Sequence, residues 1–266
     1  MGFSGVSIHK TTEYTVIFVE QFSDDIKNAL RNNLSSICHG ENKVKSGRKS
    51  YSYQKTLKSF LDRYESKTKK IKIGMIGELL VHLLISEYFD EFKVVTPYFN
   101  MEENSIKKGF DIVLTESNCA NIWITEVKSG EIHKDKNVKQ TMIDLLGTAK
   151  RDLETRLNDE NETLWMEAVN GATIALDDNN VLKSAVKDIL EDWQDEASDG
   201  IYTSCDKNVM LAGVLFSIND GTINSEAIEK KQETITNENI FNQAYLLAIQ
   251  KDTYTQMYQF LQNEVM

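Results

Sequence analysis

The chain has 266 residues and a formal net charge of −11, with 41% hydrophobic and 27% charged residues, which is typical of a globular protein. It contains no apolar run of about eighteen residues and no signal-peptide core at its start, so we expect a cytoplasmic protein without membrane contact. It also lacks a Gly-rich phosphate loop and a G-x-S-x-G motif, which leaves ATPase and serine-hydrolase chemistry without candidate residues.

The charge is distributed unevenly along the chain. Residues 1–151 carry 23 Lys and Arg against 19 Asp and Glu, a net charge of +4, whereas residues 152–266 carry 7 against 22, a net charge of −15. The first half is therefore the half suited to binding nucleic-acid phosphates. For the acidic half we expect one of three arrangements: it points away from DNA, it faces a basic partner protein, or it forms a solvated surface.

The three cysteines are far apart, which predicts reduced thiols and excludes a C-x-x-C zinc site.

The first elements in chain order are a β-prone segment at residues 11–20 and a helix at residues 21–34, capped by Ser23. The window at residues 41–72 follows, with 11 Lys and Arg against 3 acids and interleaved aromatic residues. Such a window suits phosphate binding, and an amphipathic helix over residues 53–66 that buries its aromatic residues and leaves its lysines solvated accounts for part of it. The DNA-binding candidates are Lys67, Lys69, Lys70, Lys72, Lys107 and Lys108.

An apolar helix is predicted over residues 71–89, and its most apolar part begins at residue 79. Glu78 precedes that part and falls in its first turn, where a carboxylate is either a functional group or a group that favours a helix N-terminus. A strand at residues 92–98 comes next, with Pro97 near its end.

Residues 107–130 predict two strands, 110–115 and 121–128, joined by a polar turn. Asp111 interrupts the apolar first strand, while Glu126 and Lys128 lie two residues apart and project from one face of the second. A carboxylate pair can hold a hard divalent cation, and a neighbouring lysine can orient the attacking water and offset charge in a phosphorane-like transition state. The alternative is a solvated Glu-x-Lys pair beside an aspartate that caps a turn.

A helix over residues 138–157 has apolar residues at helical spacing, and Gln140 in its first turn is a secondary site candidate, with Lys139 a weaker one. A solvent-facing helix residue is the alternative for Gln140. The remaining chain predicts a helix at residues 182–193, strands at 209–218 and 244–249, and a final helix at 253–261.

These motifs resemble the PD-(D/E)xK nuclease superfamily. The two motif halves are Gly109-Phe110-Asp111 and Glu126-Val127-Lys128. Phe110 stands where that superfamily has proline, a residue that is dispensable to the chemistry. The order of a Gly-Glu helix, a KGFDIVL strand, an ITEVKSG strand and a Lys/Gln-bearing helix, across residues 70–151, is similar to the HamA family, the nuclease-like subunit of the Hachiman anti-phage defence system.

The resemblance implies an α/β fold with a restriction-endonuclease-like core, in which helices flank a mixed sheet, and with N- and C-terminal elaborations. Residues 1–70 would form an N-terminal α/β and basic region, residues 71–158 the nuclease core, and residues 159–266 a C-terminal extension of the same domain. No linker rich in Pro, Gly or Ser marks a boundary between them.

The function that the resemblance implies is a DNA nuclease dependent on Mg²⁺ or Mn²⁺, with little sequence specificity and restrained by a HamB-like helicase subunit. The implied catalytic residues are Asp111, Glu126, Lys128, Glu78 and Gln140. The implied metal ligands are Asp111, Glu126, Glu78 and the peptide oxygen of Val127. The alternative is a catalytically weak interaction module with a nuclease fold that binds and regulates the helicase.

Overall fold

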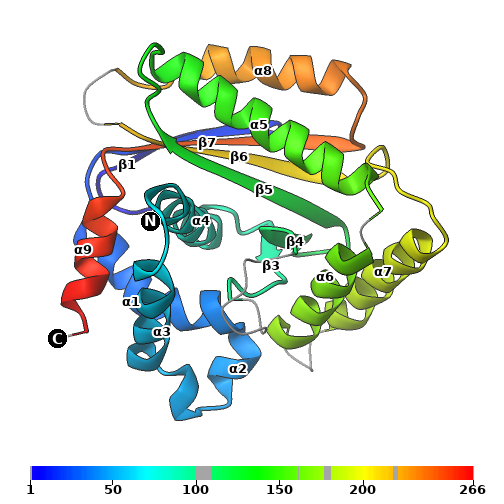
Figure 1. Ribbon diagram of the computed structural model, residues 1–266, viewed down its shortest axis with the longest axis horizontal. Helices are drawn as coiled ribbons and strands as arrows, with labels where there is room; N and C mark the ends of the chain where they lie inside the picture. The colour runs from blue at the N-terminus through cyan, green and yellow to red at the C-terminus, as the bar shows by residue number, and fades with distance from the viewer. Residues whose placement is uncertain (1, 100–108, 161, 177–180, 218–220, 266) are drawn as a thin grey trace.

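A mixed sheet of seven strands runs through the described part of the chain, which in this computed structural model comprises residues 2–99, 109–160, 162–176, 181–217 and 221–265. The strands lie in the order β1-β2-β7-β6-β5-β4-β3 (Figure 1). They are β1 (Val6–Lys10), β2 (Tyr14–Val19), β3 (Phe92–Val94), β4 (Ile112–Glu116), β5 (Ile122–Glu131), β6 (Asn208–Phe216) and β7 (Gln243–Lys251). The inner strands β2, β7, β6 and β5 are parallel, and the outer pairings are antiparallel.

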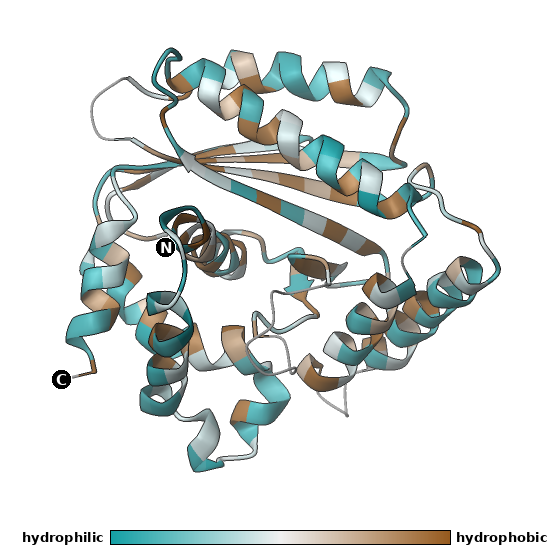
Figure 2. Ribbon diagram, in the orientation of Figure 1, coloured by the Kyte–Doolittle hydropathy of each residue, from teal (hydrophilic) through white to brown (hydrophobic). Residues whose placement is uncertain are grey.

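Helices cover both faces of the sheet. They are α1 (Asp24–His39), α2 (Glu41–Lys45), α3 (Tyr53–Glu65), α4 (Lys69–Tyr88), α5 (Val138–Asn158), α6 (Glu162–Ala175), α7 (Val181–Ser198), α8 (Ser225–Asn237) and α9 (Thr255–Asn263). Helices α5 and α8 lie over one face, and α4 lies on the other face with α1, α3 and α9 (Figure 1). Hydrophobic residues are concentrated in the central strands between these layers (Figure 2), where they form one buried cluster on each side of the sheet.

The side chains of strand β5 point alternately to the two faces of the sheet, and this decides which face carries the site residues. Ile122 and Ile124 belong to the core on the α5 side, and Trp123 belongs to the core on the α4 side. Because side chains alternate along a strand, Glu126 and Lys128 face α5. The ladder between β4 and β5 ends at the pair Ile112↔Thr125, whereas β5 continues to Glu131 paired with β6. The two strands therefore part at the residue before Glu126.

Two glycines allow the helices to approach the sheet closely. A Cβ atom on Gly77 of α4 would lie 1.8 Å from Oγ and 2.6 Å from Cβ of Ser129 in β5. On the opposite face, a Cβ on Gly213 of β6 would lie 2.6 Å from Sδ of Met142 in α5. Real Cβ atoms do not approach other atoms so closely, so the contact at Gly77 requires glycine, whereas at Gly213 the flexible Met142 side chain would have to shift.

Most elements predicted from the sequence are confirmed, with ends that differ by a few residues. Five of the described elements were not predicted at all: β1, α2, the short 3-10 helix at Lys49–Tyr51, α6 and α8. The strand expected at residues 92–98 is shorter, because its pairing with β4 ends at Val94. Strands from the first, middle and last thirds of the chain share the one sheet. Among the residues described, no helix has the length and apolar character needed to cross a membrane.

The expected place of Glu78 in a first helical turn was wrong. Helix α4 begins at Lys69, with Thr68 as its N-cap accepting a hydrogen bond from the backbone N of Ile71 at 3.5 Å. Glu78 therefore lies in the middle of α4 rather than in a first turn. Gly74 and Gly77 both lie inside the helix, and Gly77 makes the close contact with β5.

We predict that Gly77→Ala lowers the free energy of unfolding by about 1–3 kcal/mol, the usual cost of overpacking a core. Rotating the Ser129 hydroxyl away does not remove the clash, since the Cβ of Ser129 remains at 2.6 Å. Gly74→Ala in the same helix is the matched control, because a Cβ atom at Gly74 would meet no described atom within 4 Å beyond the backbone of its own helix. This control is expected to be neutral or to stabilise by up to about 1 kcal/mol. Chemical denaturation measures both, and equal effects would contradict the account.

Candidate active site

Asp111 occupies the position at which β4 and β5 separate. It directly precedes β4, and its Oδ2 accepts a hydrogen bond from the backbone N of Val127 at 2.8 Å. The carboxylate thus replaces the strand backbone that would otherwise satisfy this N–H group. Because the N–H and C=O groups of one strand residue point to the same side, the peptide oxygen of Val127 also points towards Asp111.

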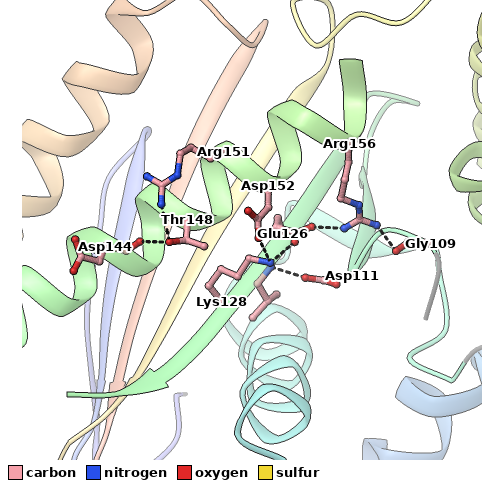
Figure 3. Close-up of polar contacts among 10 residues, drawn as sticks. Gly109, Asp111, Glu126, Lys128, Asp144, Thr148, Arg151, Asp152 and Arg156 are labelled. Carbon is pink, nitrogen blue, oxygen red and sulfur yellow. Dashed lines mark hydrogen bonds and ion pairs between the residues drawn. The ribbon is translucent and has the colours of Figure 1, made fainter. Parts of the chain in front are cut away.

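Glu126 is a buried carboxylate, with only 2% of the residue exposed. Its Oε1 accepts a hydrogen bond from Nζ of Lys128 at 2.6 Å, and its Oε2 accepts one from Nη1 of Arg156 at 2.6 Å (Figure 3). Burial raises the pKa of Glu126 and the negative charge of Asp111 raises it further, while Arg156 and Lys128 oppose the rise. Glu126 and Asp111 are therefore close enough to interact as like charges.

Lys128 links Glu126 to helix α5. Its Nζ lies 2.6 Å from Oε1 of Glu126 and 2.9 Å from Oδ2 of Asp152. Burial lowers the pKa of Lys128, but the negative charge of Glu126 and the bonds to Glu126 and Asp152 outweigh burial, so the net pKa is raised. At neutral pH Lys128 is consequently an ammonium group, suited to donating hydrogen bonds.

Helix α5 supplies two charged groups that the sequence analysis did not single out, Asp152 and Arg156. They lie four residues apart and so share one face of the helix. Besides its bond to Glu126, Arg156 donates from Nη2 to the backbone oxygen of Gly109 at 2.5 Å, and its guanidinium carbon lies 5.4 Å from the centre of the Phe110 ring. In the sequence, the only sign of these two residues was an Asp and an Arg four positions apart, next to the apolar residues of α5. Such a spacing is also typical of an ordinary ion pair on a protein surface.

Gln140 lies at the other end of α5. It forms a capping box with Asn137: the Gln140 N donates to Asn137 Oδ1 at 2.9 Å, and the Asn137 N donates to Gln140 Oε1 at 3.1 Å. The sixteen residues from Gln140 to Arg156 span roughly 24 Å of helix. The structure therefore does not bring Gln140 to the carboxylates, although it brings the same helix to them by its C-terminal turns. Lys139 shares the first turn with Gln140.

Glu78 lies on α4, and it acts electrostatically on Tyr98, as Asp111 does. Burial raises the pKa of the Tyr98 hydroxyl, and the charges of Glu78 and Asp111 raise it further, so both carboxylates lie within electrostatic range of Tyr98. The Tyr98 hydroxyl itself donates to the backbone oxygen of Met75 in α4 at 3.1 Å. Among the described residues, no three His, Cys, Asp or Glu side chains gather closely enough to hold a metal ion by themselves. Asp111 and Glu126 lie close enough to interact as like charges, and the Val127 N–H group, on the same strand as Glu126, bonds Asp111.

Four of the candidate DNA-binding lysines surround the start of α4. Lys69 pairs with Glu131 at the end of β5, with 2.5 Å between Nζ and Oε2, and Nζ of Lys72 lies 5.3 Å from the centre of the Tyr64 ring. Lys67 lies just before the helix and Lys70 in its first turn. The other two candidates, Lys107 and Lys108, lie outside the described residues.

The fold and site define a mixed α/β protein in which two carboxylates and a lysine meet where two strands part. The family model of HamA matches residues 5–263, nearly the whole chain, and the chain therefore belongs to the HamA family. Membership implies a role in Hachiman anti-phage defence. No curated protein matches the chain in a sequence comparison.

We predict that the wild-type protein loses stability relative to Glu126→Gln as the pH rises above about 4.5. The pKa of Glu126 is raised from its usual 4.5 in the folded protein, so the unfolded chain releases this proton at lower pH than the folded chain does. Between the two pKa values, the difference in free energy of unfolding should change by at most about 1.4 kcal/mol per pH unit.

Urea denaturation at several pH values measures this difference. Glu13→Gln, the same change at an exposed residue before β2, is the control and should follow the wild type. A wild type that gains stability relative to Glu126→Gln across this window would show that Arg156 and Lys128 dominate the carboxylate.

Proposed function

We propose that this chain is a metal-dependent deoxyribonuclease and the nuclease subunit of a Hachiman defence complex, hydrolysing phosphodiester bonds with little sequence preference. The observation that carries the proposal is the convergence of Asp111, Glu126 and the Lys128 ammonium at the end of the β4–β5 ladder. Membership in the HamA family supports the setting in anti-phage defence.

The donor set fits a hard divalent cation. Asp111, Glu126 and the Val127 peptide oxygen would hold it, with Glu78 contributing from α4 through a water, and all of these are oxygen donors, as Mg²⁺ and Mn²⁺ prefer. The two carboxylates also concentrate negative charge in a buried place, since Asp111 raises the pKa of Glu126. When bound, the cation supplies Lewis-acid activation of water and neutralises charge on the phosphate.

The side chains of the site have separate roles in this proposal. Lys128 donates hydrogen bonds as an ammonium group, so it orients the attacking water and offsets negative charge that develops on the phosphate. Asp152, 2.9 Å from Nζ of Lys128, keeps the lysine on the α5 side of the sheet. Glu126 is held by Lys128 on one oxygen and by Arg156 on the other, which limits the rotamers open to it.

DNA would reach the site along the basic start of α4. The ion pair between Lys69 and Glu131 shows that this end of α4 lies next to the strand that carries the site. Lysines that contact phosphates position DNA without reading its sequence, which is consistent with a nuclease of little sequence specificity. A helicase partner would then restrain cleavage, and the net charge of −15 on residues 152–266 suits binding to a basic protein surface.

One observation favours the second candidate, an interaction module with a nuclease fold. Both carboxylate oxygens of Glu126 already bond to cationic side chains, Lys128 and Arg156, as they would in a site with a purely structural purpose. A nuclease requires at least one of these bonds to give way to a cation or to be shared with it.

We predict that Glu126→Gln and Lys128→Gln each lower the rate of DNA cleavage by at least about 100-fold, because Glu126 would hold the cation and Lys128 would offset charge on the reacting phosphate. The assay follows plasmid and linear DNA with Mg²⁺ or Mn²⁺, using the chain alone and the chain co-purified with its helicase. Glu13→Gln, the same change at an exposed residue outside the site, is the control and should cleave as the wild type does. Cleavage at the wild-type rate by either site variant would refute the assignment.

A further inference from the structure

The two halves of the site come from separate segments, and one guanidinium group spans them. Arg156 donates from Nη1 to Oε2 of Glu126 at 2.6 Å and from Nη2 to the backbone oxygen of Gly109 at 2.5 Å. Gly109 lies two residues before Asp111, and Glu126 lies on β5. Arg156 therefore connects the backbone that leads into Asp111 with the second carboxylate.

We propose that Arg156 is a positioning residue that holds Glu126 and the segment leading to Asp111 in the arrangement needed to bind a divalent cation. This inference rests on the proposed function, because it concerns the same site. Arg156 acts through Glu126 and Gly109 rather than on the cation or on DNA.

None of the neighbouring contacts described here both connects the two segments and holds the Glu126 carboxylate, as Arg156 does. Lys128 bonds the other oxygen of Glu126, but Lys128 lies on the same strand and so does not connect β5 to the Gly109 segment. The bond from the Val127 N to Asp111 does connect the two segments, yet it leaves the Glu126 carboxylate free to rotate about its own side-chain torsions. With Lys128 on Oε1 and Arg156 on Oε2, the plane of the Glu126 carboxylate is fixed.

An arginine is suited to this position and a lysine is not. The planar guanidinium presents its N–H groups in a rigid fork, so two acceptors in different directions are bonded at once. The stacking of Arg156 near the Phe110 ring, at 5.4 Å, further orients the fork. A lysine ammonium keeps the charge, but its flexible stem does not hold two acceptors in a fixed relation.

The test is calorimetric titration of the full chain with Mn²⁺ in the absence of DNA. Arg156→Gln is expected to weaken Mn²⁺ binding by about 10–100-fold, the usual effect of losing a group that orients a metal ligand. Arg156→Lys should recover only part of this loss. Arg151→Gln is the matched control: Arg151 lies on the same helix and bonds Thr148 Oγ1 at 3.1 Å, turned away from the site (Figure 3). Its Mn²⁺ affinity should equal that of the wild type.

Thermal denaturation of the same samples separates positioning from a merely structural role. If Arg156→Gln does not fold, Arg156→Lys alone decides the matter, since it preserves the charge. Wild-type Mn²⁺ affinity in the folded Arg156 variants would overturn the inference and leave the proposed function standing. Tighter binding in Arg156→Gln would also overturn it, by showing that Arg156 competes with the cation. If the wild type binds no Mn²⁺, both the proposed function and this inference fall.

Discussion

The buried carboxylate of Glu126 is the constraint on which the rest of the site depends. An ionised carboxylate inside a protein costs several kcal/mol of desolvation unless charged partners and hydrogen bonds compensate it. Here the compensation comes from Lys128 on the same strand and from Arg156 on α5. Helix α5 must therefore lie over β5 at a fixed height and rotation, and the packing of helix on sheet becomes part of the site.

Glycine contacts set that packing on both faces of the sheet. Gly213 brings α5 close to β6, and Gly77 brings α4 close to β5 beside Ser129. Each glycine lies near a group of the site: Gly77 directly precedes Glu78, and Gly213 pairs with Lys128 across the β5–β6 ladder. The geometry of the charged groups thus follows from close apolar packing, which is more rigid than the charged side chains themselves.

The sequence predicted the elements that local patterns determine. The alternation along β5 placed Glu126 and Lys128 on one face, and the apolar periodicity of α5 gave both ends of that helix within one residue. Glu78 was placed in a first turn because the apolar run begins after it, but the helix starts earlier, where Thr68 caps it. The apolar run marks the buried part of α4 and not its first turn, which is polar and capped by Thr68.

The two site residues of α5, Asp152 and Arg156, could not be predicted from the sequence around them. An Asp and an Arg four residues apart on a helix are common on solvated faces, and nothing in their spacing shows that a buried carboxylate lies opposite. Gln140 attracted attention by its place in the first turn, and that place explains its capping bond with Asn137. Pairings across 30 residues, such as that of Arg156 with Glu126, appear only when the chain is folded.

Anomalous diffraction from crystals grown with Mn²⁺ tests the central claim most directly, because it locates the cation without relying on activity. The account predicts an anomalous peak between the carboxylates of Asp111 and Glu126, with an oxygen of Glu126 turned to the ion. The absence of a peak there at saturating Mn²⁺, with Glu126 still bonded on both oxygens by Lys128 and Arg156, would contradict it and favour a structural site.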